Sequence, residues 1–309
     1  MAPLLSGSGV PPWVDCDAGG AGPRQRMRIL HVTPYYAPAW AWGGVVAAVS
    51  GLARAQQRAG HHVQVLTTDT LGPWTRGQAG TTTLDGVPVW RTRTRSLALR
   101  ARLNLSWPRG FFAAAYRLIE HDGVEVVHCH ELRTVETIAA SRAAARKGAP
   151  VVLSPHGTLS YETGRKELKR VFDALLARRF FGRFAHVVAL TSCEADEVRK
   201  LWASLGVPIH GGQVSIVPHG VDPGPAVEAP ERRAARDRLG LLTEDRVVLF
   251  MGRLHERKRI PLLIEAFALF AGRCRNARLI LAGPDAGALT AVRAAVLRPR
   301  AVLEAAEAT

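Results

Sequence analysis

The sequence predicts an α/β protein built from two doubly wound parallel-sheet domains, the second of which is incomplete. Three observations predict this class. Short apolar runs alternate with longer amphipathic segments along most of the chain, and polar or glycine-rich turns follow several of the apolar runs. The pattern then restarts after a proline-containing segment at 223–230. The expected domains are 27–225 and 226–309, preceded by a disordered leader over 1–26.

The first expected domain alternates strands with helices. Residues 27–33 form a sharp apolar strand, and the Gly-, Pro- and Ser-rich residues before it are a disordered leader or sequence translated from upstream of the natural start. The further strands expected here are 62–68, 87–92, 124–128, 151–154, 186–190 and 214–217. The expected helices are 45–59, 132–147, 166–181 and one that begins at Thr191 or Ser192. Strands joined by helices predict a parallel sheet with right-handed crossovers.

The second expected domain holds only part of such a pattern. Helices are predicted at 231–239 and 260–271, and strands at 247–251 and 277–282. Residues 286–309 are rich in Ala and Arg with weak periodicity. Because a doubly wound domain needs more than two strands, this half of the chain is expected to be incomplete.

Length and composition favour a folded protein. The chain has 309 residues, of which 47% are hydrophobic, so it can bury a large core. No run of residues is long and apolar enough for a membrane-spanning helix, and the N-terminus does not resemble a secretory signal. The four cysteines form no CxxC pair, which argues against a zinc site or a disulfide framework. We therefore expect a cytoplasmic protein.

The chain is basic, with a formal net charge of +15. Three explanations remain open: a drift in composition toward Arg, attraction to anionic membranes or substrates, and nucleic-acid binding. The charges are dispersed in doublets and triplets, and aromatic residues do not interleave with them as in single-strand binders. We expect no nucleic-acid partner, and peripheral association with an anionic membrane stays open.

Gly43 and Gly44 precede the first helix and follow a strand that ends in Thr33-Pro-Tyr-Tyr. Glycines at such a turn let the backbone approach a phosphate or a sugar, and the helix N-terminus supplies N–H groups. A tight turn without a ligand explains the same residues, so both interpretations stay open.

Several histidines fall at strand ends, where open α/β sheets bind ligands. His128 and His130 share one face of their strand because side chains alternate along it. They could line a cleft, serve as ordinary loop histidines, or bind a metal, although no third ligand is evident. His156 sits in Ser-Pro-His-Gly, where its imidazole could hydrogen-bond a sugar hydroxyl or a developing charge, or simply form a turn. His219, in Val-Pro-His-Gly, is expected to be structural rather than catalytic.

A basic loop follows the first strand of the second domain. Gly252 allows close backbone approach, and Arg253 and Lys258 flank the turn that leads into the helix expected at 260. Two cations and a helix N-terminus at one strand end are typical of a diphosphate-binding site, where leaving-group charge is stabilised. A solvated basic turn would explain the charges but not their place at a strand end.

Taken in order, these motifs resemble the family 4 glycosyltransferases, retaining enzymes of the GT-B architecture with two Rossmann-like domains. The resemblance covers residues 27–285. The segments that carry it, besides the Gly43-Gly44 turn, are Val127-His-Cys-His-Glu-Leu-Arg133, Ser154-Pro-His-Gly-Thr-Leu159, Leu190-Thr-Ser-Cys-Glu194, Val217-Pro-His-Gly-Val-Asp222 and Gly252-Arg-Leu…Lys258.

The resemblance implies transfer of a sugar, with retention, from a nucleotide-diphosphate sugar to a glycan or lipid-linked acceptor. Arg253 and Lys258 would grip the diphosphate, His156 would face the transferred sugar as the catalytic residue, and Gly43-Gly44 would lie against donor or acceptor. No metal or other cofactor is implied.

The sequence departs from the family at several positions. The family usually has Asn where His219 stands and often Gly where Arg259 stands. Its Glu-(seven residues)-Glu motif, which holds the donor sugar and ribose, has no match after Asp285. A frameshift or premature stop is therefore expected, with impaired turnover. The alternative function is a non-catalytic binding or interaction protein, and a basic nucleic-acid binder is a third reading without a motif to support it.

Overall fold

The computed structural model describes residues 26–103, 105–161, 166–222 and 228–297. The leader expected over 1–26 therefore lies almost entirely outside the described residues. By its internal contacts the chain divides into two compact units, unit 1 (Met1–Asp222) and unit 2 (Pro223–Thr309). Each unit is an α/β structure, as the sequence predicts.

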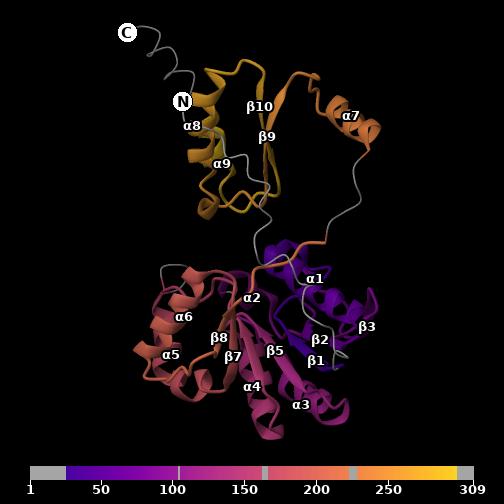
Figure 1. Ribbon diagram of the computed structural model, residues 1–309, viewed down its shortest axis with the longest axis vertical. Coiled ribbons are helices and arrows are strands. Elements are labelled where there is room, and N and C mark those ends of the chain that lie inside the picture. Colours follow the sequence, from indigo (N-terminus) through magenta and orange to yellow (C-terminus); the bar gives the residue numbers. More distant parts are fainter. Residues whose placement is uncertain (1–25, 104, 162–165, 223–227, 298–309) are drawn as a thin grey trace. The chain divides into compact units, whose positions relative to one another are not determined.

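Unit 1 is built on an eight-stranded sheet in the order β3-β4-β2-β1-β5-β6-β7-β8 (Figure 1). Its strands are β1 (Arg28–Val32), β2 (His62–Thr68), β3 (Gly80–Leu84), β4 (Val87–Thr92), β5 (Val126–His130), β6 (Val151–Ser154), β7 (Phe184–Ala189) and β8 (Val214–Ile216). Every neighbouring pair is parallel except β3 with β4, which is antiparallel at one edge. The carboxyl ends of β1, β5 and β6 therefore meet at one edge of the sheet, which the sequence prediction of a parallel sheet requires.

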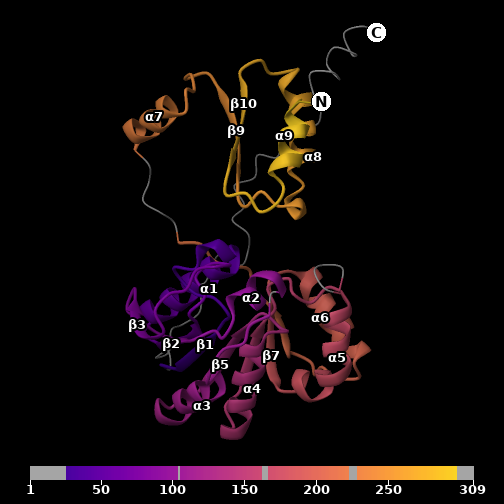
Figure 2. The ribbon, with the colours of Figure 1, turned by 180° about the vertical axis from the view of Figure 1, so that it is seen from behind.

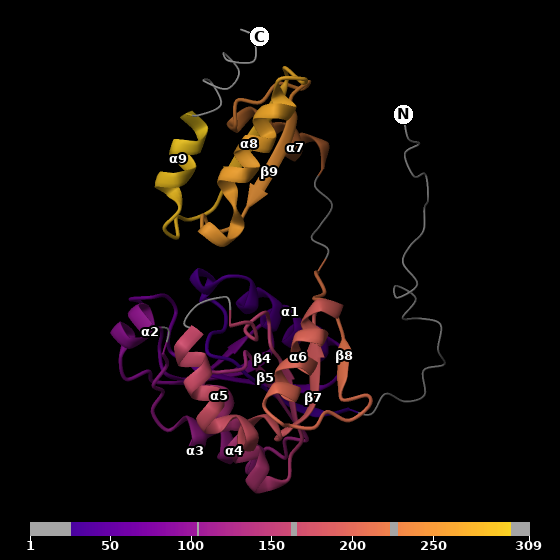
Figure 3. The same cartoon turned by 90° about the vertical axis from the view of Figure 1, so that its left-hand side faces the viewer.

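Helices cover both faces of this sheet. They are η1 (Trp40–Trp42), α1 (Gly44–Arg58), α2 (Leu97–Leu103), α3 (Phe111–His121), α4 (Val135–Lys147), α5 (Lys166–Phe181) and α6 (Ser192–Ser204). One hydrophobic cluster joins α1 to β2 and β4, and a larger one packs α3 and α4 against β1 and β5. Helices therefore lie on opposite sides of the strands (Figures 1 and 3), which is the doubly wound arrangement.

The structure corrects some predicted boundaries in unit 1. The strand predicted at 124–128 is β5, Val126–His130, because Val124 is buried in the turn before the strand rather than in it. The edge strand β3 and the helices α2 and α3 were not predicted. Thr191 is the N-cap of α6, and its side chain accepts a hydrogen bond from the Glu194 N–H.

Unit 2 contains a two-stranded parallel sheet of β9 and β10. Its elements are α7 (Ala229–Arg238), β9 (Arg246–Met251), η2 (Glu256–Lys258), α8 (Ile260–Ala271), β10 (Ala277–Ala282) and α9 (Leu289–Leu297). The helix α9, in the segment of weak periodicity, was not predicted. Figure 2 shows α8 and α9 together on one side of the two strands.

The core of unit 2 lies under these two helices. Ile260, Ile264 and Val292 are buried there against Phe250 and Leu279 of the strands. The opposite face of β9 is open: Leu249 is 59% exposed and Met251 is 83% exposed. None of the described helices in either unit is both long enough and apolar enough to cross a bilayer.

Candidate functional site

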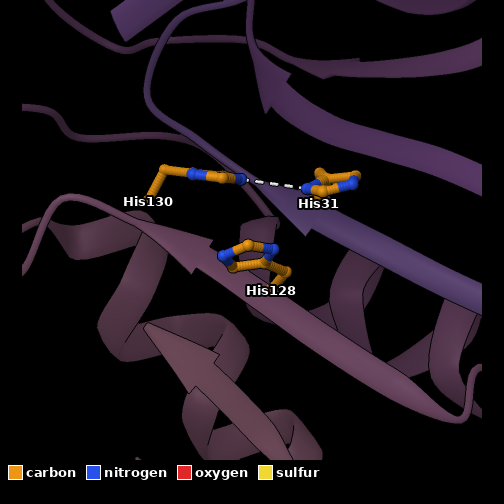
Figure 4. Close-up of side chains that lie close together, drawn as sticks. All are labelled: His31, His128 and His130. Atoms are coloured by element: carbon orange, nitrogen blue, oxygen red, sulfur yellow. Dashed lines mark hydrogen bonds between the residues drawn. The ribbon is translucent and has the colours of Figure 1, made fainter. Parts of the chain in front are cut away.

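Three histidines come together on one face of the unit 1 sheet (Figure 4). His31 on β1 is paired in register with His128 on the adjacent strand β5, so both side chains point to the same face. His130 lies two residues farther along β5 and shares that face. All three are buried, with His31 and His130 at 0% exposure. The predicted face-sharing of His128 and His130 is confirmed, and His31 is the third member that sequence spacing did not reveal.

Hydrogen bonds connect these rings to their neighbours. Nδ1 of His31 lies 2.9 Å from Nε2 of His130, and Nδ1 of His130 lies 2.9 Å from Nε2 of His156. At the other end, Nε2 of His31 lies 2.6 Å from Oε1 of Gln56 on α1. His128 bonds instead to the Ser154 hydroxyl, at 2.8 Å.

Burial keeps this cluster neutral. It lowers the pKa of His31 to about 4, partly offset by the hydrogen bond to Gln56. Burial also holds the pKa values of His128 and His130 well below their usual range, and neighbouring histidines add to the effect. The pKa of His156 falls to about 4, again through burial and then through His219. Near neutral pH these four rings are uncharged.

His156 lies two residues beyond the end of β6 in a constrained turn. Its φ is +53°, in the left-handed region, and Gly157 follows at +71°. The Glu194 carboxylate fixes the turn, because Oε1 accepts the Gly157 N–H at 2.6 Å and Oε2 accepts the Leu190 N–H at 2.7 Å. The ring of His219 stacks on His156 with centroids 5.1 Å apart. The turn geometry therefore serves to present His156 in one orientation.

A buried ion pair supports the same loop from the other side. Arg133 binds both carboxylate oxygens of Asp173 on α5, at 2.9 and 2.7 Å. Its guanidinium also donates to the carbonyl oxygens of Thr158 and Leu159. The Tyr161 hydroxyl donates to Asp173 as well. The segment after His156 is thus tied to α5 by charge-assisted hydrogen bonds.

Glu131, next to the cluster in sequence, is a titratable residue that sequence reasoning did not single out. It directly follows His130 and adopts a left-handed φ of +66°. Burial raises its pKa to about 7, and Arg100 opposes the shift. A carboxyl group that titrates near neutrality is a candidate acid or base. The position of Glu131 after His128 and His130 was visible in the sequence, but its partly buried surroundings were not.

The three histidines also form the group that could hold a metal ion among the described residues. Their ligand atoms lie within 4.8 Å of one another. Nitrogen ligands of this kind suit zinc. However, the facing nitrogens of His31 and His130 are already joined at 2.9 Å, closer than the about 3.3 Å that two tetrahedral zinc ligands require. The residues as placed fit hydrogen bonding better than metal binding.

Gly43 and Gly44 lie at the N-terminus of α1, as predicted. Gly43 is the N-cap with a φ of +89°, a conformation that favours glycine, and no side chain caps the helix. A Cβ at Gly44 would meet nothing within 4 Å. The Val46 N–H already donates to the Gly43 carbonyl oxygen at 3.2 Å, so the N–H groups of Gly44 and Val45 are the ones that a ligand could bind.

In unit 2, the predicted basic loop follows β9. Arg253 and Lys258 are both exposed, and within the described residues neither forms an ion pair. The loop packs against the turn after β10, where the Gly252 N–H donates to Ala282 and the Leu254 N–H to Pro284. A Cβ at Gly283 would lie 1.9 Å from the Gly252 carbonyl oxygen, so only glycine fits there. Lys258 ends η2, and α8 begins at Ile260 as predicted.

A hollow in unit 1 lies elsewhere. It has a volume of about 710 Å³ and lies between the end of α6 and β8, lined by residues such as Arg199, Val207 and His210. None of the histidines of the cluster lines it. We therefore assign the candidate site by side-chain chemistry at the carboxyl ends of β5 and β6, and not by cavity size.

A doubly wound sheet with polar side chains at its carboxyl ends, followed by a second α/β unit with a basic strand-end loop, defines a GT-B-type glycosyltransferase fold. Comparison with known proteins agrees. The Glycosyltransferase Family 4 pattern matches residues 42–224. The chain belongs to Glycosyltransferase Family 4.

Individual relatives are more distant. The chain is 24% identical to the GDP-mannose:cellobiosyl-diphosphopolyprenol alpha-mannosyltransferase of Komagataeibacter xylinus, over 84% of this chain and 58% of that protein. It is 27% identical to the D-inositol 3-phosphate glycosyltransferase of Xylanimonas cellulosilytica, over 89% of this chain and 66% of that protein. The chain thus spans less than two thirds of either relative.

Among solved structures, Anabaena Alr3699/HepE in complex with UDP and glucose is similar in fold. Its TM-score is 0.58 at 17% sequence identity, over 89% of this chain and 66% of that one. At this identity the likeness concerns the fold alone.

Proposed function

We propose that this protein is a retaining glycosyltransferase that moves a sugar from a nucleotide-diphosphate sugar to a polysaccharide or lipid-linked acceptor. The observation that carries the proposal is Nδ1 of His156, a buried ring nitrogen without a hydrogen-bond partner among the described residues. A ligand hydroxyl at this nitrogen would supply the missing hydrogen bond. The relatives support the substrate class, since one is named for GDP-mannose and one similar structure holds UDP and glucose.

In this proposal the two units do different work. His156 of unit 1 binds a hydroxyl of the transferred sugar and remains uncharged, because its pKa of about 4 lies far below neutrality. The N–H groups at the start of α1, of Gly44 and Val45, bind donor or acceptor oxygens. Arg253 and Lys258 of unit 2 bind the diphosphate and stabilise the negative charge of the leaving group. With two cations and the N-terminus of α8 in that role, the reaction needs no metal in principle.

Donor binding is tested by titrating the full chain with UDP-glucose and GDP-mannose. Arg253→Ala and Lys258→Ala should each weaken binding about 10- to 100-fold, the effect of losing one hydrogen bond to a charged group. Arg257→Ala is the matched control, because Arg257 is an exposed cation of the same loop. If all three variants weakened donor binding equally, the loop would attract the donor only through nonspecific charge, and the proposed diphosphate site would be refuted.

Turnover is tested by following sugar release or transfer from the same donors. His156→Ala should reduce kcat by about 100-fold or more if the imidazole acts on the reacting sugar. The exposed His210 provides the control variant His210→Ala. Donor binding without any turnover by the unaltered chain would contradict the catalytic proposal.

The second candidate function is that of a non-catalytic binding protein of the same family. It predicts donor binding without turnover. The open face of β9 favours it, because Val247, Leu249 and Met251 are exposed side by side on alternate positions. Such a protein should self-associate or bind a partner through this apolar face. Sedimentation analysis of Leu249→Lys against the unaltered chain distinguishes the two candidates.

We further propose that the protein works at the cytoplasmic side of the inner membrane, bound peripherally. The net charge of +15 supports attraction to an anionic leaflet. Co-sedimentation with anionic vesicles should be strong in low salt and lost in high salt, and neutral vesicles should not bind.

A further inference from the structure

A continuous path of hydrogen bonds runs through the interior of unit 1 to His156. It starts at Gln56 on α1, passes through His31 on β1 and His130 on β5, and ends in the turn after β6. Its three links measure 2.6, 2.9 and 2.9 Å. We infer that this path fixes which ring nitrogen of His156 carries the proton, and so makes its Nδ1 an acceptor for a substrate hydroxyl.

The ring geometry supports hydrogen bonding rather than stacking. The His31 and His130 centroids lie 5.2 Å apart, while their nearest nitrogens are only 2.9 Å apart. The same two distances, 5.2 and 2.9 Å, separate His130 and His156. The rings therefore meet edge to edge through their nitrogens, where the N–H and the lone pair lie.

Neutral rings can occupy such a path in only two ways. A neutral imidazole has one N–H donor and one bare acceptor nitrogen, so each ring must donate in the same direction as its neighbour. The Gln56 oxygen faces His31 and can only accept. His31 therefore carries its proton on Nε2, and so do His130 and His156 in turn.

The consequence appears at the far end of the path. With its proton on Nε2, His156 presents a bare Nδ1, and this is the buried nitrogen that has no partner among the described residues. A hydroxyl can donate to it, whereas a ring oxygen or a carbonyl cannot. His31, His130 and Gln56 are positioning residues in this account, and its functional half rests on the role proposed for His156.

The direction of the path depends on the Gln56 amide. If the amide nitrogen faced His31 instead, every proton would move to the other nitrogen, and Nδ1 of His156 would become a donor. A residue on α1 thus determines the hydrogen-bonding character of a ring three links away.

The test is ¹⁵N NMR of the full chain with labelled histidine rings, which reports the protonated nitrogen of each ring. The unaltered protein should show Nε2–H in His31, His130 and His156. Gln56→Lys replaces the acceptor by a group that can only donate, and it should shift all three rings together to Nδ1–H. Gln57→Lys is the matched control, because Gln57 is the next residue of α1 and accepts from the Val63 N–H instead.

Nδ1–H rings in the unaltered protein, or rings that respond independently to Gln56→Lys, would overturn the proposal. The proposal would also be overturned if one equivalent of Zn²⁺ converted the ring signals of His31, His128 and His130 into those of metal-bound histidines. UDP-glucose and GDP-mannose are then added. A shift of the His156 Nδ1 signal supports hydroxyl binding. If the hydrogen-bond path is intact but the signal does not shift, the inferred path is correct and the proposed function of His156 is refuted.

Discussion

In unit 1 the strands β1 and β5 are buried on both faces, whereas in unit 2 the strand β9 is covered on one face only. The doubly covered sheet can hold histidines without water, and so it lowers their pKa values and fixes their hydrogen bonds. In unit 2 the charged side chains of Arg253 and Lys258, in the loop after β9, are exposed to solvent. The two units therefore differ in electrostatic character: unit 1 holds buried, uncharged histidines, and unit 2 carries solvent-exposed cations.

The comparison can be followed experimentally because the aromatic residues are unevenly distributed. All seven tryptophans precede residue 203, so tryptophan fluorescence reports on unit 1, while far-UV circular dichroism reports on both units.

The largest effect is expected from Gly283→Ala. The new Cβ would lie 1.9 Å from the Gly252 carbonyl oxygen. Moving either backbone would break the hydrogen bonds between the loop after β9 and the turn after β10. Unit 2 should fail to fold, with loss of far-UV signal and an unchanged tryptophan transition. Gly51→Ala is the control in unit 1: nothing lies within 4 Å of its Cβ, and it should stabilise α1 by about 1 kcal/mol. A folded unit 2 in Gly283→Ala would refute the close backbone approach.

The next largest effect should come from Arg133→Ala, which leaves the Asp173 carboxylate buried without its cation. Breaking such a pair typically costs about 3–5 kcal/mol, measured here by urea denaturation followed by tryptophan fluorescence. Arg199→Ala removes the exposed pair with Asp196 and should cost no more than about 0.5 kcal/mol. Similar losses in the two variants would mean that burial does not strengthen the Arg133 pair.

Acid should destabilise unit 1 selectively. The pKa values of His31 and His156 are about 4 in the folded state against 6.5 ordinarily, so the unfolded state binds more protons between these values. The free energy of unfolding is therefore highest above pH 6.5 and falls as the pH drops toward 4, by on the order of 3 kcal/mol for His31 alone. In the described part of unit 2 the single histidine, His255, is only half-buried. The measurement is the free energy of unfolding from tryptophan fluorescence at a series of pH values. A value that does not change between pH 6.5 and 4 would contradict the buried neutral cluster.

The smallest effect is a gain in unit 2. Arg259 is the N-cap of α8 and adopts a left-handed φ of +49°, a conformation that costs a non-glycine residue about 1–2 kcal/mol. Arg259→Gly should recover most of that, seen as slower amide hydrogen exchange in α8. Arg257→Gly, at a residue without positive φ, should bring no such gain. Equal protection in both variants would remove the conformational explanation.

The elements that sequence predicted best are those with strong local signals. The Gly252 turn, the start of α8 at Ile260 and the Thr191 cap follow from a glycine, an apolar helical pattern and a capping residue close in the chain. The helix α3 was missed although it carries an apolar face, and α9 was missed because its Ala-rich sequence has little periodicity.

The candidate site was predicted in its parts but not in its connections. His128, His130 and His156 were identified from their places at strand ends. His31 and Gln56 were not, because they join the cluster only through strand pairing and helix packing, across 99 and 25 residues of sequence respectively. Likewise, the left-handed φ of Arg259 gives a physical reason for the glycine that the family often has there.

The Glu194 carboxylate has a consequence for how this sequence can change over generations. One side chain holds the backbone at Gly157 and at Leu190, so the loops after β6 and β7 are kept at a fixed length relative to each other. An insertion or deletion in either loop would release both, together with the orientation of His156.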